Sequence, residues 1–150
     1  MKIEYRVGNI LTTDCKYICH CVNMQGRYNS GVAKEIRYEY PKAYELYYEA
    51  YLERAIHLGQ IIGADCGKHI ILNLVGQRYY GREPGRVYAD YIALRKGFQS
   101  INKNISEAVA FPLIGCGTAG GDWKIVSSIL EEESTNFQPV VYQFDDEIKY

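Results

Sequence analysis

The sequence predicts an α/β domain in which helices cover a central sheet. Short apolar runs of strand length alternate along the chain with segments whose apolar residues recur at helical spacing. The 150 residues contain no linker, repeat or low-complexity stretch, so we expect one domain spanning residues 1–150. Hydrophobic residues make up 47% of the chain and charged residues 23%, which is typical of a globular protein with a real core.

The N-terminal part of the chain predicts two strands and two helices. Alternation indicates a strand near residues 2–7, and the apolar run 17–22 indicates a second strand that ends at a polar, glycine-containing turn. The small-residue turn 29–31 then opens a helix. Pro41 suits the first turn of the next helix, whose tyrosines and leucine follow the spacing of one helical face.

The middle of the chain predicts two more strands and a helix. The strands lie near residues 59–65 and 69–75, and a loop rich in glycine follows over 76–85. The helix after this loop has one apolar face, so it packs on the sheet. That face is outlined by Tyr88, Tyr91, Ile92, Phe98 and Ile101.

The C-terminal part predicts a fully buried strand over residues 108–114, followed by a glycine-rich loop over 115–121. Asp122 is expected to cap the next helix, and residues 139–144 form a last strand. Ligands of such sheets bind beyond the carboxyl ends of the strands. The loops that follow the strands are therefore the candidate site.

Charge and cysteine content exclude several classes of protein. The formal net charge is −1, so duplex nucleic acid is not an expected partner. No apolar run approaches the roughly 18 residues that a membrane span needs. The five cysteines cannot all pair and no signal peptide precedes them, so we expect a cytoplasmic protein with free thiols.

The segment 114–122 is the most informative stretch for function. Four glycines within residues 115–121 leave backbone N–H groups open to a ligand, and the following helix adds its positive dipole end. Phosphate is the natural guest of such a loop. The alternative is a plain strand-to-helix turn that needs positive φ angles.

Two enzyme classes fit this loop poorly. It satisfies G-x-G-x-x-G, but the dinucleotide fingerprint sits early in its domain and needs an acidic residue about 20 positions later, where this chain has Val140. A phosphatase with a cysteine nucleophile needs an arginine six residues after Cys116, and that position holds Asp122. Cys116 is interpreted as a small loop residue.

A second small-residue turn, Asn29-Ser30-Gly31-Val32-Ala33, also leads into a helix. It offers a second anion site, and two such turns could hold the two phosphates of one pyrophosphate. The alternative is simple capping of the helix by Asn29 or Ser30.

Four metal-type side chains lie close together in sequence, at Cys15, Cys19, His20 and Cys21. Strand alternation puts Cys19 and Cys21 on one face and His20 on the other, so we expect no metal site. His20 lies near the end of a buried-type strand, beside the presumed ligand edge. It is either a hydrogen-bonded core histidine or a group for proton transfer near neutral pH.

These segments, in this order, resemble the macrodomain family over nearly the whole chain. The resemblance is greatest to the branch of ADP-ribose-1″-phosphate phosphatases, near the terminal ADP-ribose glycohydrolases. It implies a three-layer α/β/α fold with a mixed central sheet and a cleft for ADP-ribose. The segments that carry it are Gly8-Asn9-Ile10, His20-Cys21-Val22-Asn23, residues 29–33, Gly76-Gln77, Pro112 to Gly117, Gly121-Asp122-Trp123 and Val141-Tyr142-Gln143-Phe144.

The resemblance also implies roles for individual residues. The backbone near Asn9 and Ile10 would meet the adenine, and Phe144 would pack on the base. Asn23 would face the distal ribose. The two small-residue turns would hold the pyrophosphate and distal ribose, through Ser30, Gly31, Val32 and Ala33 and through Leu113, Ile114, Gly115, Cys116, Gly117, Thr118, Ala119 and Gly120.

The chain departs from the family at three positions. Asn9 stands where many macrodomains have an aspartate. The branch that removes ADP-ribose from glutamate uses a lysine that forms a covalent sugar adduct, and Gln77 occupies that region here. That branch also uses an aspartate where this chain has Ala119. The mechanism through a covalent lysine adduct is therefore not available to this chain.

The leading hypothesis is hydrolysis of ADP-ribose 1″-phosphate to ADP-ribose and phosphate. His20 would act as general acid or base, while Asp122 would either cap its helix or position water. No metal or other cofactor is needed, and a monomer is expected. The alternatives are a non-catalytic reader of ADP-ribose and a lysine-independent hydrolase that acts on ADP-ribosylated protein.

Overall fold

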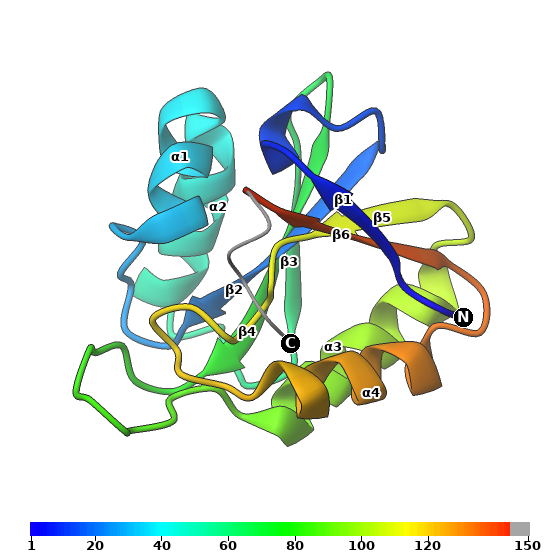
Figure 1. The fold of residues 1–150 in the computed structure, drawn as a ribbon. Helices are drawn as coiled ribbons and strands as arrows, with labels where there is room; N and C mark the ends of the chain where they lie inside the picture. Colours follow the sequence, from blue (N-terminus) through cyan, green and yellow to red (C-terminus); the bar gives the residue numbers. More distant parts are fainter. Residues whose placement is uncertain (145–150) are drawn as a thin grey trace.

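The computed structural model describes residues 1–144 and places a sheet between two pairs of helices (Figure 1). The predicted order of strands and helices is confirmed. Its elements are β1 (Glu4–Val7), a 3-10 turn (Ile10–Thr12), β2 (Tyr17–Asn23), α1 (Gly31–Glu39), α2 (Pro41–Leu52), β3 (Ile61–Asp65), β4 (Ile70–Gln77), α3 (Tyr91–Asn104), β5 (Ala108–Phe111), α4 (Trp123–Glu133) and β6 (Gln138–Gln143).

The sheet has the strand order β1-β6-β5-β2-β4-β3. All neighbouring pairs are parallel except β3 with β4, so the sheet is mixed, as expected. The five parallel strands end at one edge, where the loops after β1, β2, β4 and β5 lie beside the end of β6. The fold thereby brings together segments that are far apart in sequence.

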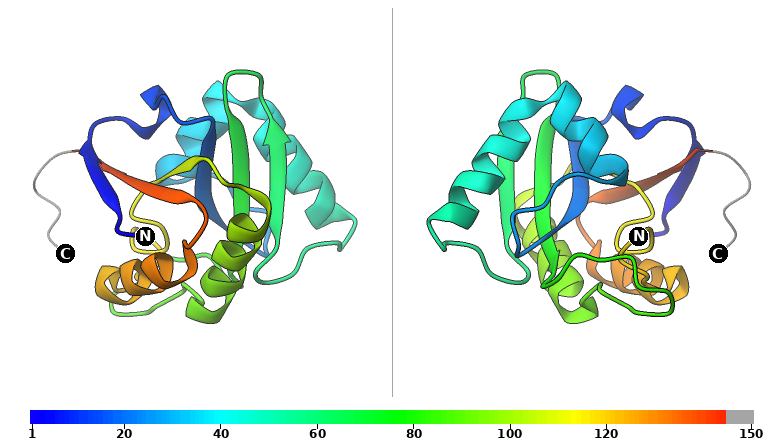
Figure 2. Two further views of the ribbon diagram at one scale, coloured as in Figure 1. Left: turned by 90° about the vertical axis from the view of Figure 1, so that its right-hand side faces the viewer. Right: turned by 90° about the vertical axis from the view of Figure 1, so that its left-hand side faces the viewer.

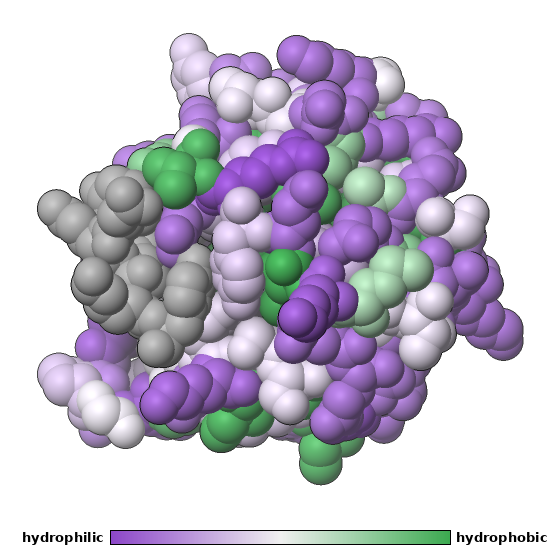
Figure 3. Space-filling view, turned by 45° about the vertical axis from the view of Figure 1, so that its right-hand side comes forward, coloured by the Kyte–Doolittle hydropathy of each residue, from purple (hydrophilic) through white to green (hydrophobic). Residues whose placement is uncertain are grey.

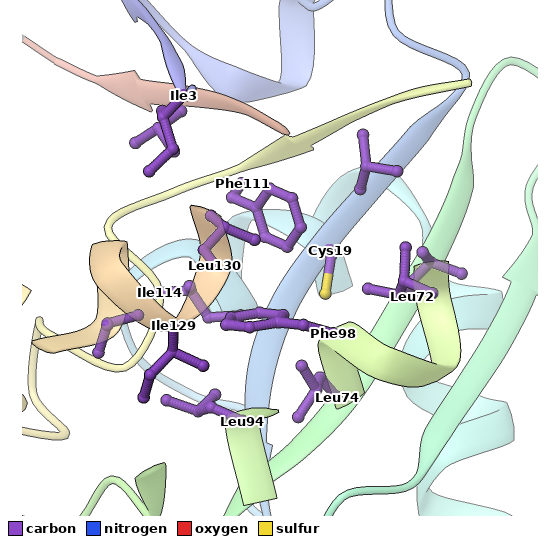
Figure 4. Packing of buried hydrophobic residues seen from close by; sticks show 14 of the residues in the cluster. Ile3, Cys19, Leu72, Leu74, Leu94, Phe98, Phe111, Ile114, Ile129 and Leu130 are labelled. Carbon is purple, nitrogen blue, oxygen red and sulfur yellow. The ribbon is translucent and has the colours of Figure 1, made fainter. Parts of the chain in front are cut away.

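Helices cover both faces of the sheet (Figure 2). Helices α1 and α2 pack on one face, where Ile36 and Tyr47 meet apolar residues such as Ile18. Helices α3 and α4 pack on the other face, where Phe98 lies near Cys19 and among other apolar side chains (Figure 4). Successive residues of β2 thus enter opposite cores, as the pleat of a strand requires.

Three details of the sequence prediction were wrong. Ile92 is 71% exposed, because the buried face of α3 is set by residues such as Leu94, Phe98 and Ile101. The strand expected over 108–114 ends at Phe111, where the chain turns into the glycine-rich loop. Gly76 and Gln77 belong to β4 rather than to the loop after it.

The surface carries apolar residues only in small, separate groups on the face shown in Figure 3, which is mainly hydrophilic. None of the helices in the described part of the chain has the length and apolar character needed to cross a bilayer.

Candidate functional site

A cleft runs along the carboxyl ends of the parallel strands. It consists of a first cavity of about 690 Å³ and a second of about 470 Å³. The two cavities share Gly31, Val32, Pro112, Leu113 and Gly117, so they are continuous. The first cavity also contains His20, Asn23, Gln77 and Arg82, and the second contains Gly8, Ile10, Glu35 and Phe144.

The glycine-rich loop after β5 presents open backbone donors at this cleft. Turn hydrogen bonds occupy the N–H groups of Cys116, Gly120 and Gly121. Within residues 1–144, the N–H groups of Gly117, Thr118 and Ala119 donate to no protein acceptor. Consecutive free donors of this kind form a concave site for an anion. The phosphate-binding interpretation is therefore favoured over that of a plain turn.

Two residues of the predicted set differ in place or role within this loop. Gly120 lies outside the linings of both cavities. Its φ of +72°, and the 2.5 Å between an added Cβ and the Arg86 carbonyl oxygen, show that it serves the loop's shape. The Ala119 carbonyl anchors the loop by accepting from the N–H groups of Tyr88 and Ala89 at 2.7 and 3.1 Å.

The N-terminus of α1 is also open. Ser30 is the N-cap residue, but its side chain makes no capping hydrogen bond. The Asn29 side-chain oxygen instead accepts from Arg37 at 2.8 Å. The alternative of simple capping by Asn29 or Ser30 was therefore wrong, and the first N–H groups of α1 remain available to a ligand together with the positive end of the helix dipole.

Asp122 has the capping role that its position predicts. Its carboxylate accepts from the Lys124 N–H at 2.9 Å, at the N-terminus of α4. Asp122 is not among the residues that line either cavity. We assign it to capping and propose no catalytic role for it.

His20 is buried, with 2% of its surface exposed, and belongs to a hydrogen-bonded network. The Asn73 amide nitrogen donates to the carbonyls of Ala43 and Ile62, so its oxygen faces His20 and Tyr28. That oxygen lies 2.7 Å from His20 Nε2 and 2.7 Å from the Tyr28 hydroxyl, which donates to it. Nε2 is therefore the protonated nitrogen of the ring.

The other ring nitrogen of His20, Nδ1, makes no hydrogen bond within the described residues. No fully buried side-chain nitrogen or oxygen lacks a partner there, so Nδ1 is not fully enclosed by protein, and His20 lines the first cavity. Burial lowers the pKa of His20 to about 4. The hydrogen bond to Asn73 acts in the opposite direction and has the smaller effect. At neutral pH the ring is therefore uncharged and keeps one nitrogen as an acceptor, which fits a base rather than an acid.

The cysteines behave as neutral small residues. Burial raises the pKa of the Cys116 thiol to about 12, and that of Cys21 likewise. Neither is a thiolate nucleophile at neutral pH, which agrees with the interpretation of Cys116. Cys19 and Cys21 pack toward α3 and α4 while His20 contacts Tyr28, and residues 1–144 contain no group of three potential metal-ligating side chains.

Two of the three residues predicted for the adenine, Ile10 and Phe144, are found at the second cavity. Ile10 is buried and Phe144 is 58% exposed, and both line it. The Asn9 side chain instead accepts from the Leu11 N–H at 3.0 Å, and Asn9 is not part of the lining. Asn23 lines the first cavity, as expected, and its oxygen accepts from the Gln25 N–H at 2.9 Å.

Sequence reasoning missed several residues of the first cavity. Arg27, Tyr80 and Arg82 line it, and they bring positive charge and an aromatic ring to the first cavity, whereas Phe144 lines the second. Nothing in their spacing distinguishes them from surface residues. Tyr28 was missed because it is one of fifteen tyrosines, and only its network with His20 sets it apart.

A covered mixed sheet with two sets of open backbone donors at its carboxyl edge is typical of an α/β domain that can bind an anionic ligand. The family model described as Macro domain matches residues 19–130. The chain belongs to the macrodomain family, which confirms the family resemblance and the three-layer fold.

Relatives within the family have more specific names. The DNA ADP-ribosyl glycohydrolase of Mycobacterium tuberculosis is 27% identical over 135 residues, covering 85% of this chain and 37% of that protein. The protein of the same name from Thermus aquaticus is 26% identical over 133 residues, covering 83% and 36%. This chain therefore spans little more than a third of the length of these relatives. Their names do not refer to phosphatase activity, so membership of the phosphatase branch stays a prediction.

Solved structures share the fold. The macrodomain of Mycobacterium tuberculosis DarG is 24% identical, with a TM-score of 0.80 over 93% of this chain and 96% of that one. A protein of unknown function from Bacteroides thetaiotaomicron is 25% identical, with a TM-score of 0.83 over 95% and 98%.

Proposed function

We propose that this macrodomain binds ADP-ribose along the cleft and hydrolyses the phosphate ester of ADP-ribose 1″-phosphate. The observation that carries the proposal is the pair of open donor sets, at residues 117–119 and at the N-terminus of α1, that meet where the two cavities join. A diphosphate fits between them, with adenosine toward Phe144 and the distal ribose toward His20. The guanidinium groups of Arg27 and Arg82 suit an anionic group on that ribose.

The reaction needs only water and groups of this chain. Water attacks phosphorus, the bond between phosphorus and the 1″-oxygen breaks, and ADP-ribose leaves with that oxygen. His20 Nδ1 takes a proton of the attacking water and later returns it to solvent, while the 1″-oxygen of ADP-ribose gains its proton from solvent as it leaves. The backbone donors and arginines stabilise the charge on the phosphoryl oxygens. We propose no metal or other cofactor, and we keep the cytoplasm as the proposed compartment.

Phosphate release from ADP-ribose 1″-phosphate tests the proposal directly. His20→Asn should lower the rate about a hundredfold or more and leave ADP-ribose affinity nearly unchanged, because the lost group acts on the proton of water. Tyr28→Phe removes a hydroxyl from the same network without touching Nδ1 and should cost less. If both variants lose the same amount of phosphatase activity, the role of His20 is structural rather than catalytic.

The pH profile supplies a further check on His20. Its lowered pKa of about 4 means that the free protein keeps this base neutral at physiological pH. The value of kcat/KM should therefore stay flat as pH falls from 7 toward 5 and drop below that, as the ring becomes protonated. A drop centred near the ordinary histidine value of about 6.5 would contradict this assignment.

A second candidate function is release of ADP-ribose from nucleic acid. The names of the relatives favour it, since both are DNA ADP-ribosyl glycohydrolases. Water rather than a lysine would attack the distal ribose, because Gln77 stands in the region where the covalent branch has its lysine. Release of ADP-ribose from ADP-ribosylated single-stranded DNA distinguishes this candidate from the phosphatase. If the protein binds ADP-ribose but turns over neither substrate, it is a non-catalytic reader of ADP-ribose.

A further inference from the structure

One loop at the mouth of the cleft concentrates positive charge and aromatic rings. Residues 78–88, here called the Arg–Tyr loop, contain three arginines and three tyrosines against one glutamate. Its net charge of +2 contrasts with −1 for the whole chain. Tyr79 and Tyr80 are 51% and 49% exposed, although tyrosine rings usually bury more of their surface.

The Arg–Tyr loop is held against the cleft by hydrogen bonds. The Tyr80 N–H donates to the Gln25 side chain at 2.9 Å, and Gln77 Nε2 donates to the Tyr79 carbonyl at 2.8 Å. At its far end, the Tyr88 N–H bonds to Ala119 of the glycine-rich loop. The loop therefore has a set position beside the first cavity, which Tyr80 and Arg82 line.

Guanidinium groups and rings alternate along this surface. The Arg27 guanidinium lies 5.3 Å from the centre of the Tyr80 ring. That of Arg86 lies 4.7 Å from the Tyr88 ring and 6.0 Å from the Tyr79 ring. Proteins that bind single strands combine these features, since aromatic faces stack on unpaired bases and cations follow the phosphates.

We propose that the Arg–Tyr loop binds a single-stranded polynucleotide next to the ADP-ribosyl group held in the cleft. This inference rests on the second candidate function, because it names the strand that carries the group. A duplex hides the faces of its bases, and an acidic peptide offers charge without bases to stack on the tyrosines.

Binding of a short fluorescein-labelled single-stranded oligonucleotide, followed by anisotropy, tests the inference. Tyr79→Ala should weaken binding about tenfold through lost stacking. Arg78→Ala with Arg86→Ala should weaken it similarly and flatten its salt dependence. Lys2→Ala with Lys103→Ala removes the same charge from the amino-end side of the sheet and should leave binding unchanged.

None of the residues changed in this test lines the cleft, and ADP-ribose affinity from calorimetry reports on the cleft alone. Wild-type protein that binds ADP-ribose but not the oligonucleotide would refute the inference and leave the proposed function standing. The inference would also be refuted if the two lysine substitutions weakened oligonucleotide binding as much as the two arginine substitutions. Displacement of the oligonucleotide by a glutamate-rich peptide at equal concentration would refute it too. Either result would mean that binding depends on general charge alone.

Discussion

The N-termini of α1 and α4 both follow glycine-containing turns, yet they differ in what satisfies their backbone. Asp122 caps α4, and its carboxylate occupies the Lys124 N–H. Ser30 leaves α1 uncapped, and the Asn29 side chain turns to Arg37 instead. Only the α1 end lies on the cleft, where Gly31 and Val32 line both cavities.

The difference separates two ways of presenting donors to an anion. At α1 the helix end itself offers its N–H groups and its dipole. Before α4, the loop residues 117–119 offer theirs, while the helix end behind them is closed by a carboxylate. Of these two helix ends, the one with a side-chain cap lies outside the cleft, and the one without a cap lines it.

Closing the α1 end should have the largest effect. Ser30→Asp supplies the missing cap, so the melting temperature should hold or rise, while the new carboxylate repels a diphosphate at the same place. We expect ADP-ribose affinity measured by calorimetry to fall about a hundredfold, which is about 3 kcal/mol. Ser30→Ala is the matched control and should change ADP-ribose affinity little. If Ser30→Asp also leaves the affinity unchanged, the diphosphate does not bind at this turn.

Sequence reasoning located both turns and predicted the cap of α4, but it left open whether α1 is capped. The glycines near residue 117 and the buried run before them indicate a loop at the carboxyl edge, and the pleat places Cys19 and His20 on opposite faces. Whether Asn29 caps α1 depends on Arg37, eight residues away, which no local pattern specifies. Arg27 and Arg82 line the same cavity only because the chain folds, so their place in the cleft was not predictable.

The loop before α4 has its own steric requirement, and it should give the next largest effect. Gly120→Ala adds a Cβ 2.5 Å from the Arg86 carbonyl oxygen at a φ of +72°. Gly85→Ala is the matched control, because its φ is +77° but nothing lies within 4 Å of the added atom. We expect Gly120→Ala to lower the free energy of unfolding by about 2 kcal/mol more than the control, in urea denaturation, and to weaken ADP-ribose binding as well. Equal costs would mean that the loop shifts freely and does not hold its donors in place.

Removing the cap of α4 should give the smallest effect, on stability alone. Asp122→Ala leaves the Lys124 N–H without its acceptor, so the free energy of unfolding should fall by about 1 kcal/mol. ADP-ribose affinity and phosphate release should both stay at the wild-type level, since the carboxylate lies outside the cleft. A loss of turnover at unchanged stability would instead give Asp122 the water-positioning role, and the α4 end would then belong to the reacting site as the α1 end does. The contrast between the two helix ends therefore holds only if Asp122→Ala lowers the free energy of unfolding and leaves activity unchanged.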